Sequence, residues 1–483
     1  MSPAIRFQRV KILATLGPAS RAGEVVTALA QAGADGFRIN TAHTPLEHFA
    51  QLVELVREAE RASQRPLAVL CDLAGPKLRV HASATERQVT PGDELLLGPP
   101  GSQAAIPVDG FEPAAELTEN SRVLLHDGTL RLTVAALRPP FAVAVAETAG
   151  RVAPRMGINL PDRETSLPSL TARDVAALQA GVAAGVDVFA LSFVRRAADV
   201  DELRRHLAAL GSHAPIIAKL EKAQAVEPPA LEEILGAADM VMVARGDLGA
   251  ETSPERVPVL QKHIVRRARQ RGVPVMIATE MLESLVRASR PTRAEASDVA
   301  NAVFDGADAL LLTAETAIGA HPILAVQTCA RIVAGAEGHP GLGVVWGAEA
   351  GVLLEVCDEP VAEAVARAAV VAAREVGAAA IVCFTTSGRT ARLVARHRPA
   401  MPILALTPSA AVARALALLW GVEPRLAPAA PHEHESVVAL AEREAQAHGL
   451  LPPGGLLVVT HGAPVGSRPP TNLLRIHRSG GVL

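Results

Sequence analysis

Lysine is rare in this chain, and two of its lysines stand three residues apart in the segment IIAKLEKAQAV, positions 216–226. Only five of the 47 Lys and Arg residues are lysines, at positions 11, 77, 219, 222 and 262. Arginine carries a planar fork that stays charged, whereas lysine carries a compact ammonium that can focus on one oxygen. A lysine kept among so many arginines therefore indicates a site that needs a small cation, although one lysine of five could persist by chance.

Lys219 and Glu221 lie two residues apart at the end of a short apolar run. Alternation along a strand would point both side chains to the same face. An ammonium there could balance charge on a transferring phosphoryl group or on an enolate oxygen. Lys219 could instead pair with Glu221 and take no part in chemistry. Lys222 would point the other way, and we expect it to lie on the solvated surface.

The segment ARGDLGAE, positions 244–251, places Asp247 between two glycines, which permit close backbone approach to an anionic ligand. No histidine or cysteine lies nearby, so Glu221 and Asp247 together favour a hard, oxygen-ligated divalent ion, Mg²⁺ first and Mn²⁺ second. Magnesium held by two protein oxygens keeps positions for substrate oxygens and water, which suits phosphate or enolate chemistry. Either carboxylate could instead cap a helix or pair with an arginine.

Eight short apolar runs indicate the strands that would position these groups, at 11–16, 36–40, 67–72, 186–193, 216–220, 240–244, 274–279 and 308–313. Amphipathic stretches long enough for crossover helices lie between most of them. Eight such βα units are what a closed (β/α)₈ TIM barrel requires. We therefore expect an α/β fold built on this barrel.

In a (β/α)₈ barrel the loops at the carboxyl ends of the strands build the reactive site. The polar residues at those predicted ends are Arg38, Asn40, Asp72, Lys77, Arg79, Ser192, Lys219, Glu221, Arg245, Asp247, Thr279, Thr313 and Glu315. Because the parallel strands of a barrel end on one side, we expect the acids, arginines and lysines of this set to converge there.

Two further segments do not follow the alternating strand and helix pattern of the barrel. Turn signals such as PGDE, GPPGS and HDGTL separate short alternating runs between about 80 and 154, which predicts an inserted all-β domain. The barrel would then take 1–79 and 155–340. Beyond GHPGLG, strand, turn and helix repeat through AAIVCFTTSGRTARLVARHRP and later segments, which predicts a doubly wound α/β domain over 345–483.

Composition excludes several classes of partner. The net charge is −3, no basic run occurs, and tyrosine is absent, so neither a nucleic acid nor an anionic membrane is an expected partner. The cysteines at 71, 329, 357 and 383 form no CxxC pair and suggest buried thiols in a reducing compartment. No secretory leader and no apolar run of about 18 residues is evident. We expect a cytoplasmic protein.

Several segments together resemble the signature segments of the pyruvate kinase family, in the family's order. They are KILATLGPAS, DLAGPKLR, IIAKLEKAQAV, MVARGDLGAE, IATEMLESL and PTRAEASDVANAVFDGADALLLTAETAIG, and the likeness runs from about residue 10 to the C-terminus. The resemblance implies transfer of a phosphoryl group from phosphoenolpyruvate to ADP, giving pyruvate and ATP, the last step of glycolysis. It also implies that the inserted domain is a lid over the nucleotide, and that the enzyme is an allosteric homotetramer.

The resemblance also implies roles for particular residues. The implied catalytic residues are Lys219, Thr279 and Arg38, and the implied Mg²⁺ ligands are Glu221 and Asp247. The substrate would be bound by Arg38, Lys219, Arg245, Gly246, Asp247, Thr279 and Ser192. The nucleotide would be bound by Arg79, Asn40, His43 and Arg155. In this assignment the Lys219 ammonium stabilises the phosphoryl group and the enolate, and the hydroxyl of Thr279 lies near the methylene that is protonated.

Two departures from the family pattern bear on monovalent cations. The family usually carries R-x-N-F-S-H where this chain has RINTAH, so Ala42 replaces a serine that helps to hold potassium in many members. Potassium-dependent members carry D-T-K-G-P-E, whereas this chain has DLAGPK, with Lys77 in place of the glutamate. Beside Asp72, the Lys77 ammonium would supply the positive charge that K⁺ otherwise brings. The chain therefore resembles the potassium-independent class.

The segment TTSGRTA offers hydroxyls and backbone N–H groups at a predicted helix start, which suits an anion. By resemblance a sugar-phosphate or nucleotide effector binds at Thr385, Thr386, Ser387, Gly388, Arg389 and Thr390. The alternative is an ordinary N-capping turn. Trp420 could cover the sugar of such an effector, but we expect it in the core.

Two other functions compete with the kinase. A magnesium-dependent aldolase or lyase acting on a pyruvate enolate would use the same barrel and a similar metal site, but it has no phosphoryl group for Lys219 and Arg79 to hold. A non-catalytic sugar-phosphate sensor could have lost catalysis through Ala42 and Glu280. A coupled assay with phosphoenolpyruvate and ADP separates the three.

Overall fold

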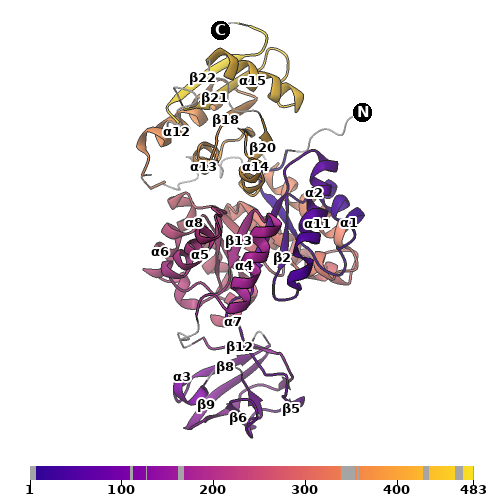
Figure 1. Cartoon of the computed structure of the whole chain (residues 1–483), viewed down its shortest axis with the longest axis vertical. Coiled ribbons are helices and arrows are strands. Elements are labelled where there is room, and N and C mark those ends of the chain that lie inside the picture. Colours follow the sequence, from indigo (N-terminus) through magenta and orange to yellow (C-terminus); the bar gives the residue numbers. More distant parts are fainter. Residues whose placement is uncertain are drawn as a thin grey trace.

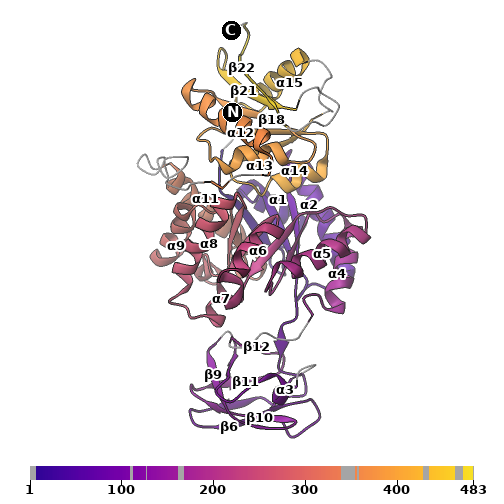
Figure 2. The same cartoon turned by 90° about the vertical axis from the view of Figure 1, so that its left-hand side faces the viewer.

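The computed structural model describes residues 7–108, 112–126, 128–161, 168–338, 354–355, 358–427, 434–462 and 471–481. Within these ranges the chain forms three bodies in a row, with a barrel in the middle, a β-rich unit at one end and an α/β unit at the other (Figures 1 and 2). None of the described helices combines the length and the apolar composition that a membrane crossing needs.

The middle body is a closed barrel of eight parallel strands, and each of the eight predicted runs supplies one. They are β1 (Lys11–Thr15), β2 (Gly36–Asn40), β3 (Ala68–Leu73), β13 (Val188–Leu191), β14 (Ile216–Leu220), β15 (Met240–Ala244), β16 (Val275–Ala278) and β17 (Ala309–Leu312). The order around the barrel follows the chain, with β1 closing on β17. The predicted TIM barrel is confirmed.

Helices cover the outside of the barrel, and the short α7 (Arg245–Glu251) lies at its carboxyl end (Figure 1). They are α1 (Gly23–Ala32), α2 (Phe49–Ser63), α4 (Ala172–Ala184), α5 (Ala197–Ala209), α6 (Ala230–Ala237), α7 (Arg245–Glu251), α8 (Val257–Arg271), α9 (Arg293–Asp305), α10 (Ala314–Ala317) and α11 (Pro322–Glu337), with 3₁₀ turns at Leu46–His48, Ala223–Val226 and Glu283–Val286. The sequence sets several of their ends. Thr171 with Asp174 and Thr292 with Glu295 form capping boxes at α4 and α9, and Gly185 ends α4 in a left-handed conformation.

The β-rich unit is inserted between β3 and α4. Its strands are β4 (Leu78–Arg79), β5 (Arg87–Val89), β6 (Glu94–Gly98), β7 (Ile106–Pro107), β8 (Arg122–Leu125), β9 (Leu130–Arg138), β10 (Phe141–Ala146), β11 (Gly150–Val152) and β12 (Gly157–Asn159), with one short helix, α3 (Pro113–Glu116). Seven of them form one sheet in the order β4-β12-β8-β9-β10-β6-β7. The unit lies beyond α7, which follows β15, and thus at the carboxyl end of the barrel (Figure 1).

The C-terminal unit has a five-stranded sheet in the order β20-β19-β18-β21-β22. Its elements are α12 (Pro360–Glu375), β18 (Ala380–Phe384), α13 (Arg389–Arg396), β19 (Ile403–Thr407), α14 (Ala410–Leu416), β20 (Val422–Leu426), α15 (His434–Ala447), β21 (Leu456–His461) and β22 (Leu473–Arg478). Only β22 pairs antiparallel. Alternate strand residues face opposite layers: Ile381 packs in the cluster of α12 to α14, and Val382 packs with α15. Helices on both faces make the unit doubly wound, as predicted.

The C-terminal unit packs on the amino end of the barrel, away from the β-rich unit (Figure 2). Trp420 is fully buried within the cluster of barrel and helix residues, which confirms that it belongs to the core. Cys71, Cys329 and Cys383 are free and buried, as expected, while Cys357 lies outside the described residues. The predicted boundary near 340–345 lies there too.

Candidate active site

Lys219 stands at the carboxyl end of β14 and points into the barrel. Along this strand Ile216, Ala218 and Leu220 pack outward against the helices, and Ile217 belongs to the interior cluster, so alternation turns Lys219 inward. Its Nζ lies 2.9 Å from Glu221 Oε1, which confirms that the two side chains share a face. The side chain is 10% exposed, so the ammonium is almost removed from water.

Side chains from two neighbouring strand ends complete the surroundings of Lys219. Its Nζ donates to Ser192 Oγ at 2.7 Å and lies 3.1 Å from Asp72 Oδ1. Arg38, on β2, holds the other oxygen of that carboxylate, with Nε 2.7 Å from Asp72 Oδ2. Arg38 Nη1 also donates to Thr15 Oγ1 at 3.3 Å. β2, β3, β13 and β14, with the residues that directly follow β13 and β14, therefore bring two cations and two acids to one point.

The charges at this point hold one another ionised. Burial raises the pKa of Asp72, but Lys219 and Arg38 outweigh burial and hold that pKa below its ordinary value. Burial lowers the pKa of Lys219, while Asp72 and Glu221 raise it further than burial lowers it. Lys219 is thus an ammonium at neutral pH, which is the state that an anionic oxygen needs.

Glu221 follows β14, and Asp247 lies in the first turn of α7, which follows the neighbouring strand β15, so the two acids are close enough to interact electrostatically. Burial raises the pKa of Glu221, and the negative charge of Asp247 raises it as well, while Lys219 opposes both. Glu221 Oε2 accepts a hydrogen bond from the Phe193 backbone N–H at 2.7 Å, which fixes the carboxylate. Lys77 Nζ lies 2.7 Å from Asp247 Oδ1. A divalent cation between the two carboxylates would relieve their repulsion, so these residues fit a metal held by hard oxygens.

A second polar group forms where β15 and β16 end. Thr279 Oγ1 accepts a hydrogen bond from the Gly246 backbone N–H at 2.9 Å, at the start of α7. Arg245 Nη2 donates to the Thr279 carbonyl at 2.7 Å, and its Nη1 lies 2.7 Å from Asp298 Oδ2. Thr279 and Glu280 have φ angles of 74° and 52°, a left-handed conformation that residues with side chains seldom adopt and that recurs at functional sites.

Comparison with known proteins shows the family. Residues 7–326 match the family model described as "Pyruvate kinase, barrel domain", and residues 363–477 match "Pyruvate kinase, alpha/beta domain". The chain belongs to the pyruvate kinase family. The pyruvate kinase of Methylorubrum extorquens is 38% identical over 478 residues, covering 98% of this chain and 97% of the relative. That of Mycobacterium tuberculosis is 37% identical over 485 residues, covering 98% and 99%.

A solved structure agrees with both the fold and the family. The pyruvate kinase from Cryptosporidium parvum matches with a TM-score of 0.91 at 30% sequence identity, covering 99% of this chain and 97% of its own. The chain is therefore a phosphotransferase of this family, and the resemblance inferred from its motifs is confirmed. Its place in the potassium-independent class stays a prediction.

The residues predicted to bind nucleotide are more open to solvent than the Lys219 cluster. Arg79 is exposed on β4 and donates from Nη1 to the Arg155 carbonyl at 3.1 Å, so these two arginines are neighbours. Burial lowers the pKa of His43, and the nearby positive charges of Arg79 and Arg38 lower it further. Asn40 uses its side-chain oxygen to accept the Ala42 N–H at 3.0 Å, which shapes the loop after β2.

The predicted effector segment joins β18 to α13. Thr385 Oγ1 accepts from the Gly388 N–H at 2.8 Å, and Gly388 has a φ of 84°. Arg389 Nε lies 2.7 Å from Glu359 Oε2, and the Thr390 hydroxyl lies 2.6 Å from that of Thr471. The exposed side chains of the segment are Thr386, Ser387 and Arg389. Thr385 therefore closes the turn, and the exposed residues remain the predicted contacts of an effector.

The prediction for Lys222 was wrong. Its Nζ lies 2.7 Å from Glu251 Oε1, and the lysine is only 12% exposed. Glu251 is the last residue of α7 and is 2% exposed; it also accepts from Asn159 Nδ2 at 3.1 Å. Glu251 thus joins Lys222 of the barrel to Asn159 of β12, where the β-rich unit returns. Strand alternation predicted only that Lys222 points away from the face that Lys219 occupies. The buried Glu251, 29 residues away in the sequence, is what surrounds the Lys222 ammonium in the folded chain.

Sequence reasoning also missed residues that hold the site residues in place. Asp298 on α9 pairs with Arg245, and its only signal was its position inside the PTRAEASDVA segment. Glu315, considered only as a strand-end acid, is fully buried and accepts backbone N–H groups from Leu282 and Thr313. It fixes two βα loops. Among the residues that the structure describes, no group of three or more His, Cys, Asp or Glu side chains could hold a metal by itself.

Proposed function

We propose that this chain transfers the phosphoryl group of phosphoenolpyruvate to ADP, giving pyruvate and ATP. The observation that carries the proposal is the convergence of the Lys219 ammonium with Ser192, Asp72 and Glu221 at the mouth of the barrel. The bond from phosphorus to the enol oxygen breaks, and a bond from phosphorus to a terminal oxygen of ADP forms. The Lys219 charge lies where it would stabilise the phosphoryl group and the enolate oxygen that is left.

The other residues would position and protonate. Arg38, fixed by Asp72 and Thr15, would hold phosphate oxygens, and the Gly246 N–H with Arg245 would face the substrate carboxylate. The enolate carbon must then accept a proton, and the Thr279 hydroxyl, held by the Gly246 N–H, would lie near that carbon. The strained backbone at Thr279 is consistent with a residue held in place for its function.

Magnesium is the metal we propose, with manganese as a substitute. Glu221 and Asp247 would hold it, because they are the hard oxygen ligands that Mg²⁺ prefers and their mutual repulsion favours a cation between them. When bound, the ion would neutralise the phosphate charge that develops during transfer. Lys219 and Lys77, which pair with the two acids, would keep the carboxylates ionised and oriented.

Activity without potassium is the second part of the proposal. Lys77 places an ammonium 2.7 Å from Asp247, inside the site, and Ala42 offers no hydroxyl to a monovalent cation. A fixed positive charge of this kind replaces the one that K⁺ would bring. Turnover in buffer free of sodium and potassium should therefore be close to turnover with added KCl. A many-fold rise on adding potassium would reject this part.

We also propose the regulatory and domain assignments that the sequence suggested. The barrel takes 1–79 and 155–340, the lid 80–154 and the effector-binding unit 345–483. The lid would close over the nucleotide from the carboxyl end of the barrel, where Arg79 and Arg155 meet. A sugar-phosphate or nucleotide would bind beside Thr386 and Ser387. Assembly as a homotetramer and a cytoplasmic location complete the proposal.

A coupled assay with phosphoenolpyruvate and ADP tests the function. Lys219→Met should lower turnover by at least about 10²–10³-fold, the loss that follows removal of one group that stabilises developing charge. Lys262→Met is the matched control, because Lys262 is 59% exposed on α8 and pairs only with Asp305 among the described residues. It should keep full activity. ATP formation that survives Lys219→Met would overturn the proposal, and an aldolase or a sensor would form no ATP at all.

A further inference from the structure

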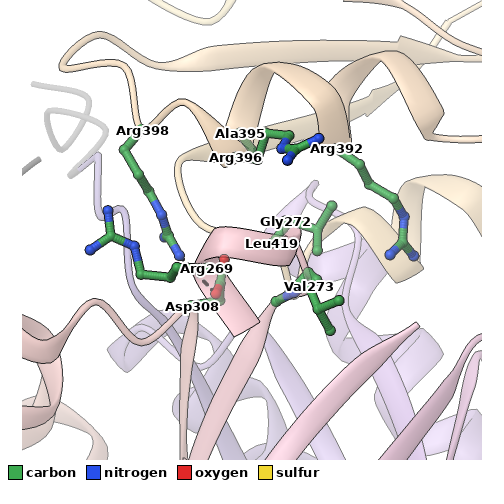
Figure 3. Close-up of a pocket in the computed structure, with 10 residues that line it drawn as sticks. Arg269, Gly272, Val273, Asp308, Arg392, Ala395, Arg396, Arg398 and Leu419 are labelled. Atoms are coloured by element: carbon green, nitrogen blue, oxygen red, sulfur yellow. Dashed lines mark hydrogen bonds and ion pairs between the residues drawn. The ribbon is translucent and has the colours of Figure 1, made fainter. Parts of the chain in front are cut away.

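A small cavity lies where the C-terminal unit meets the amino end of the barrel, far from the Lys219 cluster. Four arginines line it: Arg269 from α8, Arg392 and Arg396 from α13, and Arg398 just after α13 (Figure 3). The remaining lining residues are Gly272, Val273, Pro274, Asp308, Ala395 and Leu419. Asp308 is the only acid among them.

The positive charge of this cavity is only partly compensated. Arg398 Nη2 lies 2.8 Å from Asp308 Oδ2 and donates to the Gly306 carbonyl at 3.1 Å. Arg396 Nη1 lies 3.2 Å from Glu363 Oε2, and Arg392 Nη1 donates to the Asp239 carbonyl at 3.2 Å. The guanidinium of Arg269 makes no hydrogen bond or ion pair with any residue that the structure describes.

Two buried donors at the cavity also lack acceptors. Arg398 is 4% exposed, and neither its Nη1 nor the Nε of Arg396 has a hydrogen-bond partner in the described part of the chain. The guanidinium of Arg398 stacks 4.8 Å from the centre of the Trp420 ring, which holds it in place. Burying a donor without an acceptor costs free energy, and native proteins rarely leave one. An acceptor from outside the chain would remove this cost.

The electrostatics agree with that conclusion. Burial, together with the neighbouring charge of Arg398, lowers the pKa of Arg269 to about 10, although Asp308 opposes both. Burial also lowers the pKa of Arg392. Both shifts mean that the surroundings disfavour positive charge, although arginine keeps its proton at neutral pH. A bound negative charge would reverse that penalty.

The size of the cavity limits what can enter. Its volume is about 20 Å³, and a single water needs about 10–15 Å³. This space is smaller than a whole nucleotide or sugar phosphate, and none of its lining residues belongs to the nucleotide or effector sites proposed above. Gly272 contributes to the space, because a Cβ there would lie 2.6 Å from Arg396 Nε.

We propose that this cavity is a binding site for one small inorganic anion, a halide or a phosphate-like oxyanion, held by Arg269, Arg396 and Arg398. The anion would connect α8 of the barrel to α13 of the C-terminal unit, so its binding stabilises the junction of the two bodies. The inference does not depend on the proposed reaction, since no residue of the Lys219 cluster takes part.

The direct test is crystallographic, with the full chain purified in buffer free of chloride, sulfate and phosphate. Crystals soaked in bromide or in selenate should show an anomalous peak bounded by Arg269, Arg396 and Arg398. A peak with bromide alone assigns a halide, and a peak with selenate assigns an oxyanion. Peaks confined to the catalytic mouth or to the effector segment, with none here, would overturn the inference.

A test in solution measures whether a substitution raises or lowers the unfolding temperature, with and without anions. In the anion-free buffer Arg269→Gln should be at least as stable to heat as the original chain, because it removes a charge that repels Arg398. Inorganic phosphate or bromide should then raise the unfolding temperature less in this variant, with binding weakened by about tenfold or more. Arg266→Gln, an exposed position on the same helix, should keep the full shift. Equal shifts in both variants would contradict the inference.

Discussion

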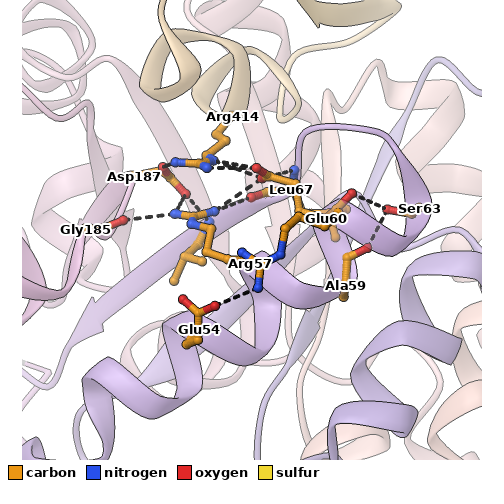
Figure 4. A network of polar contacts seen from close by, with 11 residues as sticks. Glu54, Arg57, Ala59, Glu60, Ser63, Leu67, Gly185, Asp187 and Arg414 are labelled. Atoms are coloured by element: carbon orange, nitrogen blue, oxygen red, sulfur yellow. Dashed lines mark hydrogen bonds and ion pairs between the residues drawn. The ribbon is translucent and has the colours of Figure 1, made fainter.

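Arg57 on α2 forms a buried ion pair whose loss should be costly and dependent on pH (Figure 4). Its Nη2 lies 2.7 Å from Asp187 Oδ2 and donates to the Gly185 carbonyl at 2.9 Å; its Nη1 donates to the Leu67 carbonyl at 2.9 Å. Asp187 also accepts the Val69 N–H at 2.8 Å. Arg57→Met keeps most of the apolar stem and removes every one of the guanidinium contacts.

The structure sets the size of the effect. After Arg57→Met, the buried Asp187 carboxylate keeps Arg414 as its one ion-pair partner among the described residues, with Nη1 at 3.9 Å. Removing one partner of a buried pair costs about 3–5 kcal/mol, and we expect this loss at pH 8. Arg61→Met is the control on the same helix, because Arg61 pairs with Glu54 in solvent at 2.7 Å. It should cost less than about 1 kcal/mol.

The pKa of Asp187 gives the pH dependence. Burial raises this pKa from 3.8 to about 6 even though Arg57 lowers it. Between these two values the folded chain binds more protons than the unfolded chain, so the stability from this group is present at low pH and falls as pH rises toward 6. Without Arg57 the pKa rises further, and the fall continues above pH 6 at about 1.4 kcal/mol per pH unit. The cost of Arg57→Met should therefore be smaller at pH 5 than at pH 8.

Urea unfolding of the original chain and both variants, measured at pH 5 and pH 8, tests the reasoning. At each pH the free energy of unfolding of the original chain is subtracted from that of the variant, which removes the contribution of the other titrating groups. Equal costs for Arg57→Met and Arg61→Met at pH 8 would show that the pair is not buried as described. An equal cost of Arg57→Met at the two pH values would refute the shifted Asp187 pKa.

Three shorter predictions concern activity. Lys77→Glu should create a requirement for potassium, measured as turnover with and without KCl. If KCl does not change the turnover of the variant, Lys77 does not replace the ion. Thr279→Val removes the acceptor of the Gly246 N–H and should lower turnover by about 10²-fold, whereas Thr279→Ser should keep most of it; an active Val variant would exclude the hydroxyl from catalysis. Chelation with EDTA should abolish activity and added MgCl₂ should restore it, and activity that persists in EDTA would refute the metal proposed at Glu221 and Asp247.

The sequence alone predicted the barrel because its signals are local. Each strand is a short apolar run, and alternation along β14 is enough to turn Lys219 and Glu221 inward together. The rule that parallel strands end on one side then placed Asp72 near them, before any distance was known. The doubly wound sheet followed for the same reason, since strand and helix patterns alternate along the chain.

Tertiary structure decided whatever depends on a partner distant in the sequence. Lys222 was expected in solvent, but the fold brings buried Glu251 to it. The Arg57 ion pair depends on Asp187, 130 residues away in the sequence. Because both residues are buried, removal of the pair should lower the free energy of unfolding strongly and in a way that depends on pH. Arg269 and Arg398 meet only because the C-terminal unit docks on the barrel. The periodicity of apolar residues in the sequence determines which face of a helix or strand is buried. How deeply a charged side chain is buried, and which charges balance it, depend on the elements that pack against that face.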